Sequence, residues 1–213
     1  MIKGVLFDFD GTIVDSEISR YKSIKAILSK YDISFTKKDW DLKFKSMGSV
    51  DIFEMFKKKL NLSWKSNEMY NKSHEIRYEI EKKEGVQIIK GFREFYDKLL
   101  SRGIKMLICS GGTTEHLKLV LNMLDLNSLD GFGREEYKNR KPAPDSFLEG
   151  LKRLGLNKRE VIVFEDAKSG IEAANNAKLK VVAINFIEKE IEGLNVAFKF
   201  KNYNQIDVNE ILK

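Results

Sequence analysis

The segment KGVLFDFDGT, residues 3–12, carries the strongest indication of the fold. Its first part, from Lys3 to Phe9, is a short run rich in branched and aromatic residues, a pattern typical of a buried strand. The run carries two aspartates near its end, Asp8 and Asp10, and passes into a turn that contains glycine. We therefore predict a first strand that brings two carboxylates to one edge of a sheet.

The pattern of a strand followed by a polar turn and a helix returns further along the chain. A strand-like run, Ile104 to Cys109, precedes the turn SGGTT, and another, Val161 to Phe164, precedes Glu165 and Asp166. The other segments of the pattern are a strand at Val181 to Ile184 and helices at Phe92 to Leu100, His116 to Leu124, Ser146 to Leu154 and Ser169 to Ala177. Strands that alternate with helices predict an α/β fold with a doubly wound, Rossmann-like parallel sheet covered on both faces.

Between Asp15 and Glu84 the pattern changes, because apolar residues fall at helical spacing and no strand-like run interrupts them. We predict an all-helical cap domain at residues 16–84. It would be inserted into an α/β catalytic core formed by residues 1–15 and 85–213.

The composition is that of a globular protein. The 213 residues are 42% hydrophobic and 33% charged, which excludes a disordered chain, and the single cysteine, Cys109, excludes an intramolecular disulfide. The first residues leave no room for the apolar part of a signal peptide, and no apolar run approaches a membrane span. The net charge of +6 comes from lysines scattered among acids, which argues against a nucleic-acid partner. We expect a cytoplasmic monomer without a membrane or nucleic-acid partner, with Cys109 in the core and His74 and His116 at surface or interface positions.

The acidic residues that follow the predicted strands point to a metal site. In an open parallel sheet, ligands bind outside the carboxyl ends of the strands, so Asp8, Asp10, Glu165 and Asp166 should converge. Four carboxylates so close together repel one another and do not all stay ionised without a cation. Mg²⁺ combines one or two carboxylates with water and phosphate oxygens, so the residues predict Mg²⁺ and a phosphate ester. Glu165 and Asp166 can also cap the helix that follows them.

Two aspartates one residue apart suit two catalytic roles. Asp8 can form an aspartyl-phosphate as the nucleophile, while Asp10 protonates the leaving oxygen and later takes a proton from water. Ser110 and the amide of Gly111 follow another strand and suit the binding of phosphoryl oxygens. Lys141, just before the prolines, can supply a positive charge to the phosphate and to the transition state.

Four segments of the chain carry these residues in order. They are VLFDFDGT at residues 5–12, LICSGG at 107–112, KPAPD at 141–145 and FEDAKSGI at 164–171. Together they closely resemble the motifs of the haloacid-dehalogenase-like superfamily of phosphatases and phosphotransferases. The single helical insert after the first motif resembles the subgroup that contains β-phosphoglucomutase and phosphoglycolate phosphatase.

The resemblance implies a role for each acidic residue. Asp8 would be the nucleophile and a metal ligand, and Asp10 would be the acid/base whose main-chain carbonyl also contacts Mg²⁺. Asp166 would complete the metal site, with Glu165 either ligating the metal or contacting a group that does.

The resemblance also assigns the phosphate-binding residues. Ser110 and Lys141 would hold the phosphoryl group together with Gly111. Thr12, in the same loop as Asp10, would help to orient that aspartate and to bind phosphate.

By the same resemblance, the cap closes over the site and chooses the substrate. The candidates for substrate contacts are Arg20 on the first cap helix and Lys45, Ser46 and Ser49 in a polar break between two helices. The break can equally be a plain connection and Arg20 can equally lie in solvent, so both readings stay open.

These observations predict a Mg²⁺-dependent phosphatase that hydrolyses a small phosphomonoester, such as a sugar phosphate, through phospho-Asp8. A β-phosphoglucomutase-type phosphosugar mutase is the first alternative, although the mutases of this subgroup usually have valine and histidine where this chain has Thr12 and Arg20. A catalytically silent binding module is the second alternative. A dehalogenase is disfavoured because that chemistry uses no second aspartate, whereas Asp10 is present here.

Overall fold

The computed structural model describes residues 1–45 and 47–213, which divide into two compact units. The larger unit comprises Met1–Asp15 and Val86–Lys213, and the smaller unit comprises Ser16–Gly85. The predicted insert, residues 16–84, ends one residue before the smaller unit does. The chain therefore leaves the larger unit once and returns to it.

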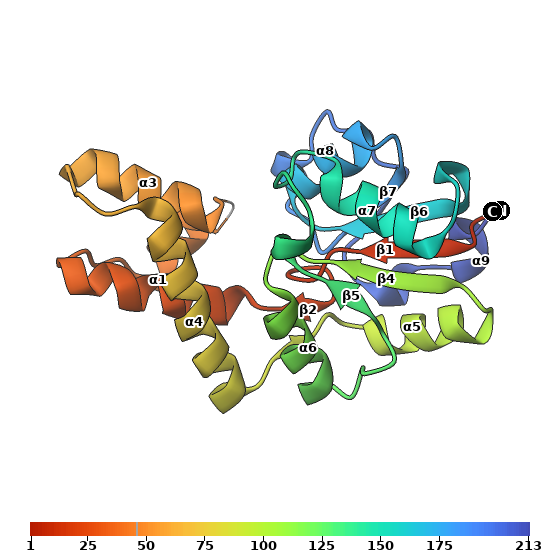
Figure 1. Ribbon diagram of the computed structural model, residues 1–213, viewed down its shortest axis with the longest axis horizontal. Coiled ribbons are helices and arrows are strands. Elements are labelled where there is room, and N and C mark those ends of the chain that lie inside the picture. The colour runs from red at the N-terminus through yellow and green to blue at the C-terminus, as the bar shows by residue number, and fades with distance from the viewer. Residues whose placement is uncertain (46) are drawn as a thin grey trace. The chain divides into compact units, whose positions relative to one another are not determined.

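Within the described residues, a six-stranded parallel sheet forms the centre of the larger unit (Figure 1). The strands are β1 (Gly4–Phe7), β4 (Lys105–Cys109), β5 (Gly131–Phe132), β6 (Val161–Glu165), β7 (Lys180–Ile184) and β8 (Phe198–Phe200). Their order in the sheet is β5-β4-β1-β6-β7-β8, so β1 lies between β4 and β6 in the middle. The predicted α/β fold with a doubly wound parallel sheet is confirmed.

Helices cover both faces of this sheet (Figure 1). They are α5 (Phe92–Ser101), α6 (Thr114–Met123), α7 (Asp145–Leu154), α8 (Lys168–Asn176) and α9 (Val208–Ile211), with 3₁₀ turns at Arg134–Glu136, Lys158–Glu160, Glu188–Glu190 and Tyr203–Gln205. Neighbouring residues of a strand point to opposite faces. Val5 and Phe7 of β1 accordingly pack into a core with α5, α6 and α9, whereas Leu6 packs into a core with α7 and α8.

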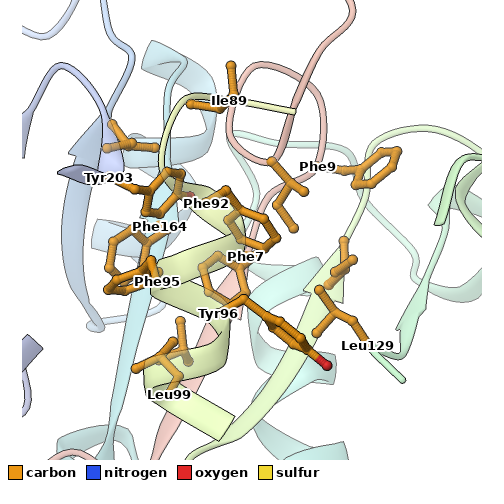
Figure 2. Close-up of a cluster of buried hydrophobic side chains, with 14 of the residues drawn as sticks. Phe7, Phe9, Ile89, Phe92, Phe95, Tyr96, Leu99, Leu129, Phe164 and Tyr203 are labelled. Atoms are coloured by element: carbon orange, nitrogen blue, oxygen red, sulfur yellow. The ribbon is translucent and has the colours of Figure 1, made fainter. Parts of the chain in front are cut away.

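Figure 2 shows the aromatic cluster that packs against β1. Phe7 lies edge-on to Phe92, with ring centroids 5.6 Å apart, and tilted against Phe164 at 5.3 Å. Tyr203 packs on the same group, with its ring 5.0 Å from Phe95 and 5.2 Å from Phe92. All five side chains are almost completely buried, so close packing holds the end of β1 in one place.

Some details of the larger unit escaped the sequence prediction. Strands β5 and β8 are too short for a pattern to stand out, and Gly131 in β5 is required because a Cβ there would lie 2.7 Å from a neighbouring side chain. Helix α6 begins at Thr114, two residues earlier than predicted, because the Thr113 side chain caps it by accepting a hydrogen bond from the amide of His116. The surface or interface position predicted for His116 is wrong, since its ring is buried and lies edge-on to Phe9.

A pair of short strands marks the point where the chain leaves and re-enters the larger unit. In the described residues, β2 (Val14–Asp15) pairs antiparallel with β3 (Gln87–Ile88), and the amide of Ile89 donates to the carbonyl of Ile13. The segment that leaves the larger unit and the segment that re-enters it therefore lie side by side. Gly85, which precedes the re-entering segment, has a φ of 80°, a conformation that glycine adopts without strain.

The described part of the smaller unit is built from helices. They are α1 (Glu17–Leu28), α2 (Lys37–Asp39), α3 (Ser49–Leu60) and α4 (Ser66–Glu84), with a 3₁₀ turn at Ser29–Tyr31 and a π-helix at Trp40–Phe44. A buried ion pair on α4, between Arg77 Nε and Glu81 Oε1 at 2.7 Å, is joined to α1 by the hydroxyl of Ser19, which donates to Glu81. Among the described residues, no helix combines the length and the apolar composition that crossing a bilayer requires.

The net positive charge of the chain is concentrated in the smaller unit. Residues 16–85 contain 16 lysines and arginines against 11 aspartates and glutamates, a net charge of +5 out of the total of +6. The larger unit is therefore close to neutral. Basic residues occur in both units, but their excess over acidic residues lies almost entirely in the smaller one.

Candidate active site

Three carboxyl groups meet at the carboxyl edge of the sheet. Asp8 follows β1, Glu165 ends β6 and Asp166 follows it, and one oxygen of each lies within 4.8 Å of the others. The register explains this arrangement, because Phe7 pairs with Phe164 and the amide of Asp8 donates to the Phe164 carbonyl at 2.9 Å. Side chains at these positions are brought together by strand pairing alone.

Lys141 places its ammonium group between two of these carboxylates. Its Nζ lies 2.6 Å from Asp8 Oδ1 and 2.8 Å from Glu165 Oε1, and its side chain is only 10% exposed. The other oxygen of Glu165 accepts the amide of Ala167 at 2.8 Å. Each oxygen of Glu165 therefore has a donor, and this carboxylate holds Lys141 beside Asp8. A Cβ on Gly170 would overlap the Glu165 carboxyl group, so that position requires glycine.

The electrostatics of the cluster depend on burial. Loss of water, together with the charges of Glu165 and Asp10, raises the pKa of Asp8 to about 7 although Lys141 opposes the shift. Loss of water also raises the pKa of Asp166 well above its usual range, with Glu165 and Asp8 adding to the effect. Burial alone would lower the pKa of Lys141, but Asp8 and Glu165 raise it, so the lysine stays protonated.

The residues present fit a hard divalent cation. The donor set of Asp8, Glu165 and Asp166 consists only of carboxylate oxygens, and Lys141 is a single positive charge beside three acids. Asp166 lies against the backbone of Gly11, where a Cβ would overlap Oδ2 of the aspartate. Gly11 also has a φ of 84°, so both its conformation and its missing side chain make room for Asp166.

The loop after β1 is held by groups from other elements. The Thr12 hydroxyl donates to Asp166 Oδ1 at 3.2 Å. The sequence predicted that Thr12 orients Asp10, whereas this hydrogen bond joins it to Asp166. Asp10 is half-buried and pairs through its backbone with Val14. Its charge contributes to the raised pKa of Asp8, which places it near the cluster.

Two residues that support this loop were missed in the sequence. The Asn185 side-chain amide donates to the carbonyl of Gly11 at 2.9 Å, and the Tyr203 hydroxyl donates to the carbonyl of Thr12 at 3.1 Å. Asn185 directly follows β7, so reading every strand end would have found it. Tyr203 comes after the short strand β8 and gave no signal. It belongs to the aromatic cluster of Figure 2, which therefore connects the core to the loop.

Ser110 lies at the same edge, on the other side of β1. It follows β4, is almost fully buried, and its amide donates to the Phe132 carbonyl at 3.0 Å. Its Oγ accepts the amide of Gly112 at 3.0 Å, so the hydroxyl belongs to a tight turn before α6. Gly111 is exposed, and a Cβ there would meet nothing within 4 Å. The preceding residue, Cys109, is fully buried as predicted, and burial raises the pKa of its thiol, which argues against a nucleophilic role.

Arg20, a predicted substrate contact, is engaged inside the smaller unit. Its guanidinium donates to the carbonyls of Lys45 and Met47, pairs with Glu17 at 3.2 Å and lies 4.7 Å from the ring centroid of Trp40. Arg20 therefore holds the backbone of the loop that follows the π-helix.

The other cap candidates have different settings. Lys45 is exposed, Ser49 is half-buried at the first position of α3, and Ser46 lies outside the described residues.

The fold and the site define a class of α/β enzyme whose acidic residues gather at the carboxyl edge of a parallel sheet. The sequence profile of the Haloacid dehalogenase-like hydrolase family matches residues 5–184. The chain therefore belongs to this family, and the predicted resemblance is confirmed.

Two of the relatives that this chain resembles are named as phosphatases. The chain is 30% identical over 200 residues to (DL)-glycerol-3-phosphatase 1, mitochondrial, of Arabidopsis thaliana, a match that covers 86% of this chain and 64% of that protein. It is 27% identical over 188 residues to the Phosphorylated carbohydrates phosphatase of Thermotoga maritima, covering 84% and 83% of the two chains. Among solved structures, β-phosphoglucomutase from Clostridium difficile shares the fold, with a TM-score of 0.81 and 22% identity over 99% of this chain and 96% of that one. The chain thus spans less than two thirds of the first relative's length.

The raised pKa values predict how stability depends on pH in the metal-free protein. Because folding raises the pKa of Asp8 from 3.8 to about 7, its protonation stabilises the fold fully below pH 3.8, and this contribution is lost as the pH rises to about 7. We expect the urea midpoint measured in EDTA to fall across this range and Asp8→Asn to flatten the slope. Asp39→Asn is the control, because the Lys43 hydrogen bond lowers the pKa of this half-buried acid, the opposite direction to Asp8. A slope that Asp8→Asn leaves unchanged would contradict the burial described for the cluster.

Proposed function

We propose that this protein is a Mg²⁺-dependent phosphatase that hydrolyses small phosphomonoesters through a phosphorylated Asp8. The observation that carries the proposal is the position of Asp8, buried at the end of β1, with Lys141 Nζ at 2.6 Å and the carboxylates of Glu165 and Asp166 beside it. The relatives named for phosphatase activity support the reaction class.

In the first step, an oxygen of the Asp8 carboxylate attacks the phosphorus of the ester. The bond between phosphorus and the ester oxygen breaks, and Asp10 donates a proton to the leaving oxygen. Lys141, the Ser110 hydroxyl and the amide of Gly111 would stabilise the negative charge on the phosphoryl oxygens. The ammonium group of Lys141 already contacts Asp8, so the charge it brings is next to the reacting oxygen.

In the second step, water attacks the phosphorus of phospho-Asp8. Asp10, now ionised, takes a proton from that water, and the bond between phosphorus and the Asp8 oxygen breaks. Inorganic phosphate leaves and both carboxyl groups return to their starting states. One aspartate thus carries the phosphoryl group while the other moves the proton, as their one-residue spacing predicts.

Asp8 and Asp166 would hold Mg²⁺ through their carboxylates and Asp10 through its carbonyl. When bound, Mg²⁺ supplies positive charge that offsets the acids and the phosphate and orients the phosphoryl oxygens. Because Glu165 already contacts Lys141 and the Ala167 amide, we assign it the role of positioning the lysine.

The smaller unit would act as the cap that selects the substrate. Its net charge of +5 favours anionic substrates, and the loop that Arg20 supports carries the exposed amine of Lys45. We propose Lys45 and Ser49 as substrate contacts, with Arg20 supporting the loop. A sugar phosphate or a similar small metabolite fits this assignment, in line with the names of the two relatives.

A phosphosugar mutase would share the first step and differ in the fate of phospho-Asp8. It would return the phosphoryl group to a sugar, whereas a phosphatase passes it to water. Incubation with glucose 1-phosphate separates the two, since release of inorganic phosphate supports hydrolysis and glucose 6-phosphate supports transfer. Absence of both products with every phosphorylated metabolite tried would favour the silent binding module.

Asp8→Asn is expected to lower the Mg²⁺-dependent hydrolysis of p-nitrophenyl phosphate by roughly 10³-fold or more, because the amide is a far poorer nucleophile. Asp97→Asn changes an exposed aspartate on α5 and should leave the rate within about twofold. Steady-state kinetics with circular dichroism spectra of both variants provide the measurement. Substantial metal-dependent activity in a folded Asp8→Asn protein would rule out the mechanism.

Gly11→Ala tests the metal site without removing a ligand. The added Cβ would overlap Asp166 Oδ2, so we expect weaker Mg²⁺ binding and a concentration for half-maximal activity raised about tenfold or more. Gly155→Ala is the matched control, because Gly155 also has a positive φ, 64°, but a Cβ there meets nothing within 4 Å. Titration of activity with Mg²⁺ measures both variants. The same Mg²⁺ dependence in the two would show that Asp166 takes no part in binding the metal.

A further inference from the structure

The segment between β5 and Lys141, residues 133–140, packs against the turn that contains Ser110. Several hydrogen bonds join them, and two of these reach the first three residues of the turn. The backbone amide of Arg134 donates to the Gly112 carbonyl at 2.7 Å, and the hydroxyl of Tyr137 donates to the Ser110 carbonyl at 3.1 Å. The first bond is between backbones, whereas the second depends on the tyrosine side chain.

Tyr137 is held in place by neighbours on both sides. The guanidinium of Arg134 donates to the carbonyls of Tyr137 at 2.5 Å and Lys138 at 2.9 Å, and it lies 4.9 Å from the centroid of the tyrosine ring. The ring also lies edge-on to Phe132 at 6.1 Å. These contacts leave the hydroxyl little freedom, so the Ser110 carbonyl faces a preorganised donor.

This bond restrains the peptide group between Ser110 and Gly111. In a trans peptide the carbonyl and the following N–H point in opposite directions, so a carbonyl turned toward Tyr137 turns the N–H of Gly111 away from it. The turn needs such a restraint because two successive glycines follow Ser110, and glycine has the widest conformational freedom. A Cβ on Gly111 would lie in open space, with nothing within 4 Å.

The same segment also leads directly into Lys141. Asn139 donates its backbone amide and its side-chain amide to Asp145 Oδ1, each at 3.0 Å, and the amide of Ala143 donates to the Arg140 carbonyl at 2.9 Å. Residues 133–140 therefore contact the turn of Ser110 at one end and are anchored beside Lys141 at the other.

We propose that Tyr137 is a positioning residue that sets the orientation of the Ser110–Gly111 peptide and thereby the donors for the phosphoryl group. The inference rests on the proposed function, in which Ser110 and the Gly111 amide bind phosphoryl oxygens. Tyr137 itself touches no reacting atom. It acts through the Ser110 carbonyl, and Arg134 acts through Tyr137.

Tyr137→Phe tests the proposal by removing one hydroxyl and keeping the ring. Because one hydrogen bond contributes about 0.5–1.5 kcal/mol, we expect kcat/KM for p-nitrophenyl phosphate to fall, and the inhibition constant of inorganic phosphate to rise, by about three- to tenfold. Tyr96→Phe is the matched control, since its hydroxyl bonds to Ser128 Oγ at 2.6 Å and belongs to the core of the same unit. The Tyr96→Phe variant should keep both constants within about twofold, although loss of its hydrogen bond lowers the melting temperature.

Arg134→Lys provides a second test that leaves Tyr137 intact. It retains the charge but loses the fork that binds two carbonyls, so we expect changes in the same direction. Unchanged kinetics and phosphate inhibition in a folded Tyr137→Phe protein, with an active wild type, would overturn the positioning role and leave the phosphatase proposal standing. A wild type that hydrolyses no phosphate ester would overturn both.

Discussion

Three carboxyl groups lie together at the end of the central strands, largely shielded from water, and the other groups of the site offset their negative charge. Burial and mutual repulsion raise the pKa values of Asp8 and Asp166, so the cluster needs positive charge to stay ionised. Lys141 supplies one such charge and is held by Glu165, whose other oxygen is bound by the Ala167 amide. The same need explains why an oxygen-ligated divalent cation suits the site and why phosphate, an anion, is a fitting substrate group once that cation is present.

The positions of these carboxyl groups are well defined because they lie at the ends of rigid, packed strands. Pairing of β1 with β6 places Asp8 beside Glu165, and the aromatic cluster of Figure 2 packs against these strands and reaches the loop through Tyr203. On the other side of β1, Tyr137 plays a comparable part for the turn of Ser110. Both tyrosines donate to a backbone carbonyl next to a proposed functional group, so side chains packed against the core hold the loops at the carboxyl edge of the sheet in place.

The sequence was sufficient for the parts of the site that follow a simple rule. The carboxyl ends of the strands in a parallel sheet share one edge, so the sequence alone predicts that Asp8, Ser110, Glu165 and Asp166 lie together. Tyr137 and Tyr203 could not, because their partners lie 27 and 191 residues away and no local pattern marks a hydroxyl that will bond to a distant carbonyl. Arg20 shows the same limit, since the sequence left open a substrate contact or a position in solvent and carried no sign of its bonds to the carbonyls of Lys45 and Met47.

Trapping the phosphorylated enzyme tests directly whether Asp8 carries the phosphoryl group. A substrate labelled with phosphorus-32 would be mixed with excess enzyme and Mg²⁺, quenched in acid within milliseconds, and digested for peptide mapping. We expect the label on the peptide that contains Asp8, its release by hydroxylamine as for an acyl phosphate, and its absence from the Asp8→Asn protein. Rapid hydrolysis by the wild type with no protein-bound label at any quench time, or with the label on another residue, would contradict the account.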